Sequence, residues 1–234
     1  MALKISILKI NGSRKKLKVY KNDLKESFRF IFRSNRMRAF VFFQIVFYSL
    51  ICVMDTYDGD LLIRIGIREE QFSMIFAVLT LIRGVSLSFK RTIEKKFKNR
   101  TLTFISLMYI SACITIGVTA SKYHGKEIIP IILIMYAIKK IFSAIWYIFE
   151  AKYLKNFTSE NGRSRITFAY EFVGGVAASI FCIFNGLILK IYNIENAYLI
   201  IGLISLASII VVLDYMRKRF GLKPEEYRKE DIEF

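Results

Sequence analysis

Six stretches with few charged residues follow one another along the chain, and short polar loops separate them. They are residues 39–54, 71–89, 101–121, 128–149, 166–189 and 196–213. A helix needs ~20 apolar residues to cross the hydrocarbon core of a membrane, and the first stretch reaches that length only if Tyr57 and its neighbours complete it. Only helices and closed barrels satisfy every backbone hydrogen-bonding group in lipid. The pattern therefore predicts an all-α membrane protein with six transmembrane helices.

Basic residues are distributed unevenly between the loops of this arrangement. The chain holds 36 Lys and Arg against 19 Asp and Glu. If the N-terminus is cytoplasmic, 28 of the basic residues lie on the cytoplasmic side and 5 on the opposite side. Such an excess sets the orientation of membrane proteins, so we expect a multi-pass protein of the cell membrane with both termini in the cytoplasm. The net charge of +17 then indicates contact with anionic lipid and not binding of nucleic acid.

The sequence divides into a basic cytoplasmic leader at residues 1–38, a six-helix bundle at residues 39–215 and a charged cytoplasmic tail at residues 216–234. Part of the leader predicts an amphipathic helix. Its apolar face holds Leu24, Phe28, Ile31 and Phe32. Its basic side chains, which would reach the lipid headgroups, are those of Lys25, Arg29, Arg33 and Arg36. A surface helix leading into the first span is favoured over a partner-binding segment.

Few residues in the sequence suit enzyme chemistry or a cofactor. Cys52, Cys113 and Cys182 all fall within predicted spans, where cysteine behaves as a small apolar residue. Neither a disulfide framework nor a thiolate metal site is expected from them. The single histidine, His124, has no Cys or carboxylate ligands nearby in the sequence. We therefore predict that the chain is not an enzyme and binds no cofactor and no metal.

Three aspartates cluster at the outer end of the first predicted span, at Asp55, Asp58 and Asp60. They could bind a cation weakly. Solvated loop charges are the favoured interpretation.

Four ionisable residues fall at membrane depth, where each costs several kcal/mol unless it is paired or hydrated. Arg83 lies in the inner half of the second span and Glu171 in the inner third of the fifth, and their similar depths predict an ion pair between them. Lys139 and Lys140 lie near the middle of the fourth span. Adjacent helical residues point about 100° apart, so at most one of the two lysines is central. The residues that neighbour Lys140 on the helix favour Lys140 as the central lysine.

A polar stripe runs along the fourth span at helical spacing. Its members are Tyr136, Lys140, Ser143, Tyr147 and Glu150. Such a stripe in an apolar helix faces a bundle interior or a wet cavity. Two interpretations stay open. Either a carboxylate such as Glu171 neutralises Lys140 and holds helices together, or the stripe lines a substrate cavity, with Tyr136, Lys140, Ser143 and Tyr147 as candidate residues.

Small residues recur at four-residue spacing on two spans. The second span carries Ser73, Ala77, Thr80, Gly84 and Ser88, and the fifth carries Glu171, Gly175, Ser179, Cys182 and Gly186. Small residues let helix backbones approach closely, so a packing role is favoured over a gating role for both stripes.

The order of these features resembles the C-terminal six-helix half of the major facilitator superfamily, over about residues 22–220. LKESFRFIF at residues 24–32 is similar to the end of the central cytoplasmic linker of that family. IGIREEQF at 65–72 is similar to the outer turn that opens helix eight, and IEKKFKNR at 93–100 to the basic inner loop that follows it. RIT at 165–167 is similar to the Arg-Ala-Thr that commonly starts helix eleven.

The resemblance implies a transporter in which two six-helix bundles rock about a site at the membrane midplane. Lys95 and Lys98 stand where the family usually has an acidic residue and a glycine. The N-terminal half, which often carries the proton-coupling carboxylates, has no counterpart in this sequence, so coupling to protons does not follow. We expect half of a secondary transporter for a small solute, paired in parallel with itself or with a separately encoded half. The alternative is a non-transporting membrane protein, either a truncated remnant or an accessory or immunity factor.

Overall fold

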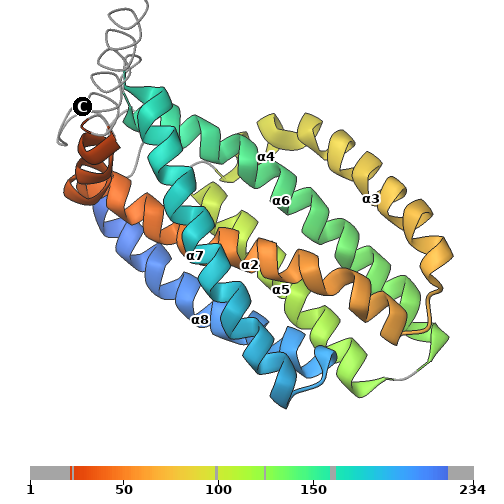
Figure 1. Ribbon diagram of the computed structural model, residues 1–234. Helices are drawn as coiled ribbons and strands as arrows, with labels where there is room; N and C mark the ends of the chain where they lie inside the picture. The colour runs from red at the N-terminus through yellow and green to blue at the C-terminus, as the bar shows by residue number, and fades with distance from the viewer. Residues whose placement is uncertain (1–21, 23, 98–99, 124, 159–161, 221–234) are drawn as a thin grey trace, which may run out of the picture.

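The structure is a computed structural model that describes residue 22 and residues 24–97, 100–123, 125–158 and 162–220. His124, most of the predicted leader and the end of the predicted tail lie outside the described residues. Every regular element in the described part is helical (Figure 1). Six of the helical segments are long and apolar enough to cross a membrane. The prediction of an all-α, multi-pass membrane protein with six spanning helices is confirmed.

Six long helices and several short ones make up the described chain. The long ones are α2 (Asn35–Arg64), α3 (Phe72–Ser86), α5 (Thr101–Lys122), α6 (Ile129–Phe157), α7 (Arg163–Ile191) and α8 (Ile194–Phe220). The short ones are η1 (Glu69–Gln71), η2 (Leu87–Phe89), α4 (Lys90–Phe97) and η4 (Lys126–Ile128). Because η1, α3, η2 and α4 follow one another without a break, they form one continuous span.

Local sequence signals define both ends of α2. At the start, the Ser34 hydroxyl accepts a hydrogen bond of 3.1 Å from the backbone N–H of Met37, as an N-cap does. At the end, Gly66 has a φ of 91°, and the N–H of Ile67 donates back to the carbonyl of Leu62. Glycine favours this left-handed position, which ends a helix. The first span therefore continues ten residues beyond the Met54 at which the sequence prediction ended it.

Residues 24–33 form a helix that precedes α2, and its buried face differs from the predicted one. Ile31 is fully buried, as expected, but Phe32 is 48% exposed and Phe30 takes its place in the core. Arg36, predicted to reach the headgroups, is buried. The ring of Phe28 makes an edge contact with Phe172 of α7 at 5.8 Å between centroids. The face that this helix packs on the bundle is therefore rotated by about one residue from the predicted face.

The core lies around α2, the most buried of the spans. Aromatic side chains surround the N-terminal half of α2. Trp146 of α6 packs against Phe43 and Phe47 at 5.1 and 5.3 Å between ring centroids. Phe40 stacks on Tyr170 of α7 at 5.4 Å. Burial of such rings removes large apolar areas from the surroundings and favours specific pair geometries.

The helices pack in an order that repeats when the first three spans are exchanged for the last three (Figure 1). The span of α3 and α4 packs on α6 through α3, and its counterpart α7 packs on α2. In the same way α5 packs on α6, and its counterpart α8 packs on α2. Because α5 and α8 are counterparts, their contact with each other is unchanged by the exchange. Since three crossings separate each helix from its counterpart, the two halves run in opposite directions, as inverted repeats do.

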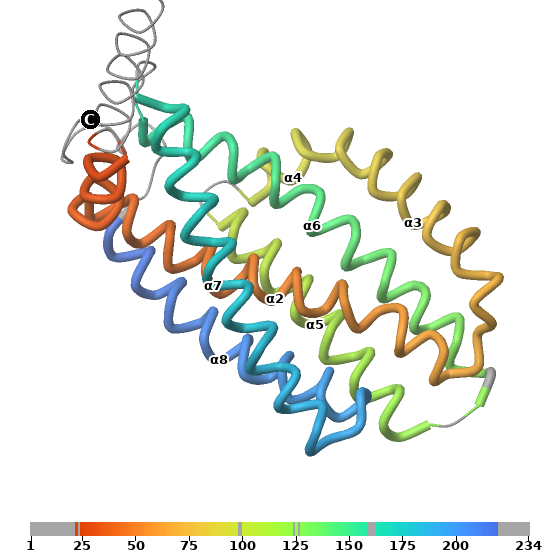
Figure 2. The backbone as a smooth tube through the Cα atoms, viewed as in Figure 1, coloured from red at the N-terminus to blue at the C-terminus, as the bar shows by residue number. Residues whose placement is uncertain are grey.

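The equivalent helices α3 and α7 are the least buried spans of the bundle, and Figure 2 shows α3 at its edge. The small residues predicted to pack on both helices are not packed. No described atom lies within 4 Å of a Cβ built on Gly84, Gly175 or Gly186. On α7 the close contact falls on the neighbouring face, where a Cβ on Gly174 would meet the Gln44 side chain at 2.5 Å. Neither stripe therefore packs closely against another helix within the described part of this chain.

Candidate functional site

A buried ion pair joins α2 to α6. The Lys139 ammonium lies 2.6 Å from a carboxylate oxygen of Asp58, and both residues are almost completely inaccessible. A buried charge is tolerated only when it is paired and hydrogen-bonded, so each side chain depends on the other. The sequence selected Lys140 as the central lysine of this helix. The structure instead places Lys139 in the core.

Tyrosines from three helices surround this pair. Tyr198 of α8 hydrogen-bonds Lys139 and donates its hydroxyl proton to Asp58 at 2.9 Å. Tyr136 donates to the backbone carbonyl of Asp58 at 3.2 Å. The Lys139 ammonium also lies 5.0 Å from the ring centroid of Tyr198 and 5.9 Å from that of Tyr109 of α5. Ring faces at such distances attract a cation, so the surroundings stabilise the ammonium as well as the carboxylate.

A second pair lies beside the first and is partly open. Lys140 lies 2.8 Å from a carboxylate oxygen of Asp55, one turn before Asp58 on α2. The Lys140 side chain is 19% exposed and that of Asp55 is 44% exposed. The second oxygen of Asp58 lies 3.9 Å from Lys140 and has no hydrogen-bond partner among the described atoms. We call Asp55, Asp58, Lys139, Lys140 and Tyr198 the charged cluster.

The charged cluster lies well inside the spans. Lys140 is 11 residues after the start of α6 and 17 residues before its end at Phe157, so it lies ~16 Å and ~25 Å along the helix axis from the two ends. Asp55 precedes Arg64, the last residue of α2, by ~14 Å. Half the hydrocarbon thickness is ~15 Å. The partly exposed pair therefore lies at hydrocarbon depth.

The predicted stripe of α6 divides between two environments. Tyr136 is fully buried and points to Asp58, and Ser143 is buried with its hydroxyl bonded to the Lys140 carbonyl. Lys140 and Tyr147 are accessible, and Tyr147 is 37% exposed. Of the four candidate cavity residues, two thus lie in the core and two lie on the surface.

The accessible residues share one side of the bundle, between α3 and α7. Tyr147 of α6 lies within electrostatic range of Tyr48, Cys52 and Asp55 on α2. Cys182, from the small-residue stripe of α7, lies within electrostatic range of Cys52. We call this side, defined by Tyr48, Cys52, Asp55, Lys140 and Tyr147, the open face.

Within the described residues, no ion pair joins Arg83 to Glu171. The Arg83 guanidinium lies 5.7 Å from the ring centroid of Tyr147. Glu171 lines a shallow cavity of about 580 Å³ at the start of α7 with Arg163 and Thr167. The helices explain the difference, since α3 packs mainly on α6 and α7 mainly on α2. Equal depth in the membrane does not bring two side chains together when their helices lie on different sides of the bundle.

Arg83→Leu should change the thermal unfolding temperature in detergent by no more than a few degrees. Arg83 is exposed and has no carboxylate partner among the described residues, so its removal leaves no buried charge behind. A surface cation–π contact contributes ~0.5–1 kcal/mol. Glu171→Gln serves as the matched control. A large loss in either variant that the double variant restores would show that the two side chains are coupled.

The sequence analysis names Lys139 but favours Lys140 as the central lysine, and it does not identify Tyr198. It interprets Asp58 as a solvated loop charge, because the first apolar run ends at Met54. One signal was present: the 16 residues of that run are too few for a span, so the helix had to continue through Asp55 and Asp58. Tyr198 is an ordinary interfacial tyrosine by sequence, and nothing in the local pattern marks it.

No family model, no curated protein and no solved structure matches this chain.

Proposed function

We propose that this chain is half of a secondary transporter of the major-facilitator type, which moves a small solute across the membrane. The observation that carries the proposal is the Asp55–Lys140 pair, which is accessible on the open face and lies at hydrocarbon depth. Lipid tails offer such charges neither hydrogen bonds nor hydration, so the cost of facing lipid is several kcal/mol or more. The open face therefore needs water, or a second protein, in front of it.

The two edge helices support this interpretation. Each turns large apolar side chains to one side, and these suit contact with lipid. On α3 they are Met74, Val78, Leu81 and Val85, and on α7 they are Val176, Ile180, Ile183 and Leu187. The small-residue stripes occupy another exposed strip of the same helices, and on α7 this strip adjoins the open face. Small and polar residues there leave room for a solute or for a facing bundle.

The order of helix packing gives independent support. Inverted repeats of three helices characterise many transporters, and substrate sites lie at the interface of such repeats near the midplane. Lys140 belongs to α6 and Asp55 to α2, which are equivalent helices under the exchange. Lys140 would attract an anionic or polar solute, with Tyr147 as a neighbouring contact. The buried Lys139–Asp58 pair would hold α2 and α6 in place behind it.

The second wall of the cavity would come from another six-helix bundle. A second copy of this chain would have to stand in parallel, since the charge bias disfavours opposite orientations. A separately encoded half is the other source. The mass of the purified protein in detergent distinguishes these assemblies from a monomer.

The native cysteines provide a test of a water-filled cavity. In a Cys182→Ala variant, Cys52 on the open face should react with a membrane-impermeant methanethiosulfonate reagent, because that reagent modifies thiols that water reaches. Cys113 is fully buried, so a Cys52→Ala/Cys182→Ala variant gives the background. We expect Cys52 to react at least tenfold faster than this background. In oriented proteoliposomes, alternating access predicts reaction from both sides of the membrane.

Val176→Cys in the Cys52→Ala/Cys182→Ala background is the lipid-facing control, because Val176 is exposed on the large apolar strip of α7. It should react no faster than the background. If Cys52 reacts as slowly as this control, the open face is covered by dry protein or by lipid. That result would favour a non-transporting accessory or immunity factor.

A further inference from the structure

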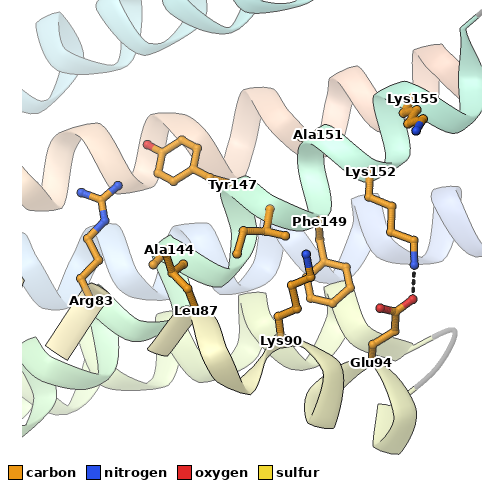
Figure 3. A pocket seen from close by; sticks show the side chains of 11 residues that line it. Arg83, Leu87, Lys90, Glu94, Ala144, Tyr147, Phe149, Ala151, Lys152 and Lys155 are labelled. Carbon is orange, nitrogen blue, oxygen red and sulfur yellow. Dashed lines mark hydrogen bonds and ion pairs between the residues drawn. The ribbon is translucent and has the colours of Figure 1, made fainter. Parts of the chain in front are cut away.

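A second cavity lies apart from the charged cluster, between the span of α3 and α4 and the last turns of α6 (Figure 3). Its volume is about 640 Å³. The cationic side chains around it are those of Arg83, Lys90, Lys152 and Lys155, with one carboxylate, that of Glu94. We call this cavity the basic pocket.

Only one of these four cations has a carboxylate partner among the described residues. Lys152 forms an ion pair with Glu94 across the pocket, which ties α4 to α6 (Figure 3). Arg83 rests on the ring of Tyr147, and Lys90 forms no ion pair within the part of the chain that the structure describes. In Figure 3 the side chains of Arg83 and Lys90 both extend from their helices toward α6. The basic pocket therefore has an excess of positive charge directed inward.

The remaining lining of the basic pocket is apolar. It comes from Leu87, Ala144, Ile148, Phe149 and Ala151 and from the ring of Tyr147, which the pocket shares with the open face. Leu87 is 43% exposed, so the apolar lining on the span of α3 and α4 is open to the surface. Apolar side chains from this span and from α6 thus lie beside the cations of the pocket.

The charge bias places this end of α3 and α6 on the cytoplasmic side, in the leaflet that carries anionic lipid. Arg83 and Lys90 are separated by seven residues, or ~10 Å along the helix axis. Lys90 therefore lies near headgroup level, and Arg83 lies about two turns deeper. A soluble anion needs only Lys90, at headgroup level. A phospholipid has a phosphate at that level, ester oxygens deeper in the membrane and then hydrocarbon chains. It therefore fits Lys90, Arg83 and the apolar walls of the pocket.

We propose that the basic pocket binds the phosphate headgroup of an anionic phospholipid from the cytoplasmic leaflet. Lys90 contacts the phosphate oxygens as a compact charge, and Arg83 donates to the glycerol ester region. The acyl chains lie along Leu87 and the apolar residues that α6 contributes to the pocket.

The test uses the full chain in nanodiscs that contain phosphatidylglycerol or phosphatidylcholine, with retained lipid counted by native mass spectrometry. We expect phosphatidylglycerol to be retained in preference to phosphatidylcholine. Removing two charges that contact the headgroup should weaken this binding by about 30-fold. The variant is Arg83→Gln/Lys90→Gln. Both residues are exposed at the protein surface, and the single Lys90→Gln variant gives a smaller loss by the same measurement if the double variant expresses poorly.

The matched control is Arg91→Gln/Lys95→Gln. These two residues are exposed on the same helix, α4, carry the same charge and do not line the basic pocket. Equal loss in the two double variants would mean general attraction to the surface and would overturn the proposal. Equal retention of the two lipids would also overturn it. Displacement of phosphatidylglycerol by millimolar inorganic phosphate would assign the pocket to a soluble anion instead. None of these outcomes bears on the reactivity of Cys52.

Discussion

Asp58→Asn should destabilise the protein by about 3–5 kcal/mol, because it leaves the ammonium of Lys139 buried without a counter-charge. The asparagine keeps the shape of the side chain, so the effect isolates the charge. The measurement is thermal unfolding in detergent, followed by the reactivity of the Cys113 thiol. Cys113 is fully buried in the folded state and becomes reactive when the bundle opens.

Two further variants separate the pair from its surroundings. Asp58→Leu combined with Lys139→Met should recover most of the loss, since an apolar pair of similar volume avoids the cost of burying charge. Asp55→Asn is the matched control on the same helix. Its carboxylate is 44% exposed, so its removal should cost far less. If Asp58→Asn and Asp55→Asn unfold at the same temperature, the buried pair does not hold α2 to α6.

Gly117→Ala should destabilise the contact between α5 and α8 by about 3 kcal/mol. A Cβ on Gly117 would lie 2.7 Å from the backbone nitrogen of Leu199, and backbone cannot rotate away as a side chain can. The contact is reciprocal, because a Cβ on Gly202 of α8 would meet Ile114 of α5 at 3.0 Å. The added methyl group therefore forces the two helices apart along their whole contact.

Gly84→Ala on α3 is the matched control for this substitution, and it should have the opposite sign. Gly84 is helical, and no described atom lies within 4 Å of the added Cβ, so alanine should stabilise the helix by ~0.5–1 kcal/mol. Both variants are measured by the same thermal unfolding. Equal tolerance of the two alanines would show that α5 and α8 do not approach as closely as the structure places them.

The small-residue stripes show why sequence periodicity did not identify the packed face. On α7, Gly174 and Ala178 form one four-residue stripe, and Gly175 and Ser179 form the next, about 100° away. Both have the spacing that favours close helix contact. The structure packs the first against α2 and leaves the second exposed. The rotation of α7 about its axis depends on its contact with α2, where Gly174 meets Gln44. The sequence pattern of α7 alone does not contain that contact.

The two lysines of α6 show that the pattern within one helix also does not identify which charged residue is buried. The sequence places Lys139 and Lys140 at hydrocarbon depth and requires partners for them. Which lysine is buried depends on the face of α6 that meets α2 and α8, and this places Lys139 between Asp58 and Tyr198. The basic pocket depends in the same way on two segments, α3–α4 and α6, that are distant in sequence.

The sequence alone determined that this chain has six helices long and apolar enough to cross a membrane. These are properties of single segments, because a helix in lipid must satisfy its own backbone and match the bilayer in length and polarity. Only the tertiary structure decided which charges pair, which stripe packs and where cavities form. Those outcomes depend on the rotation and register of one helix against another, and they follow from contacts between residues that lie far apart along the chain.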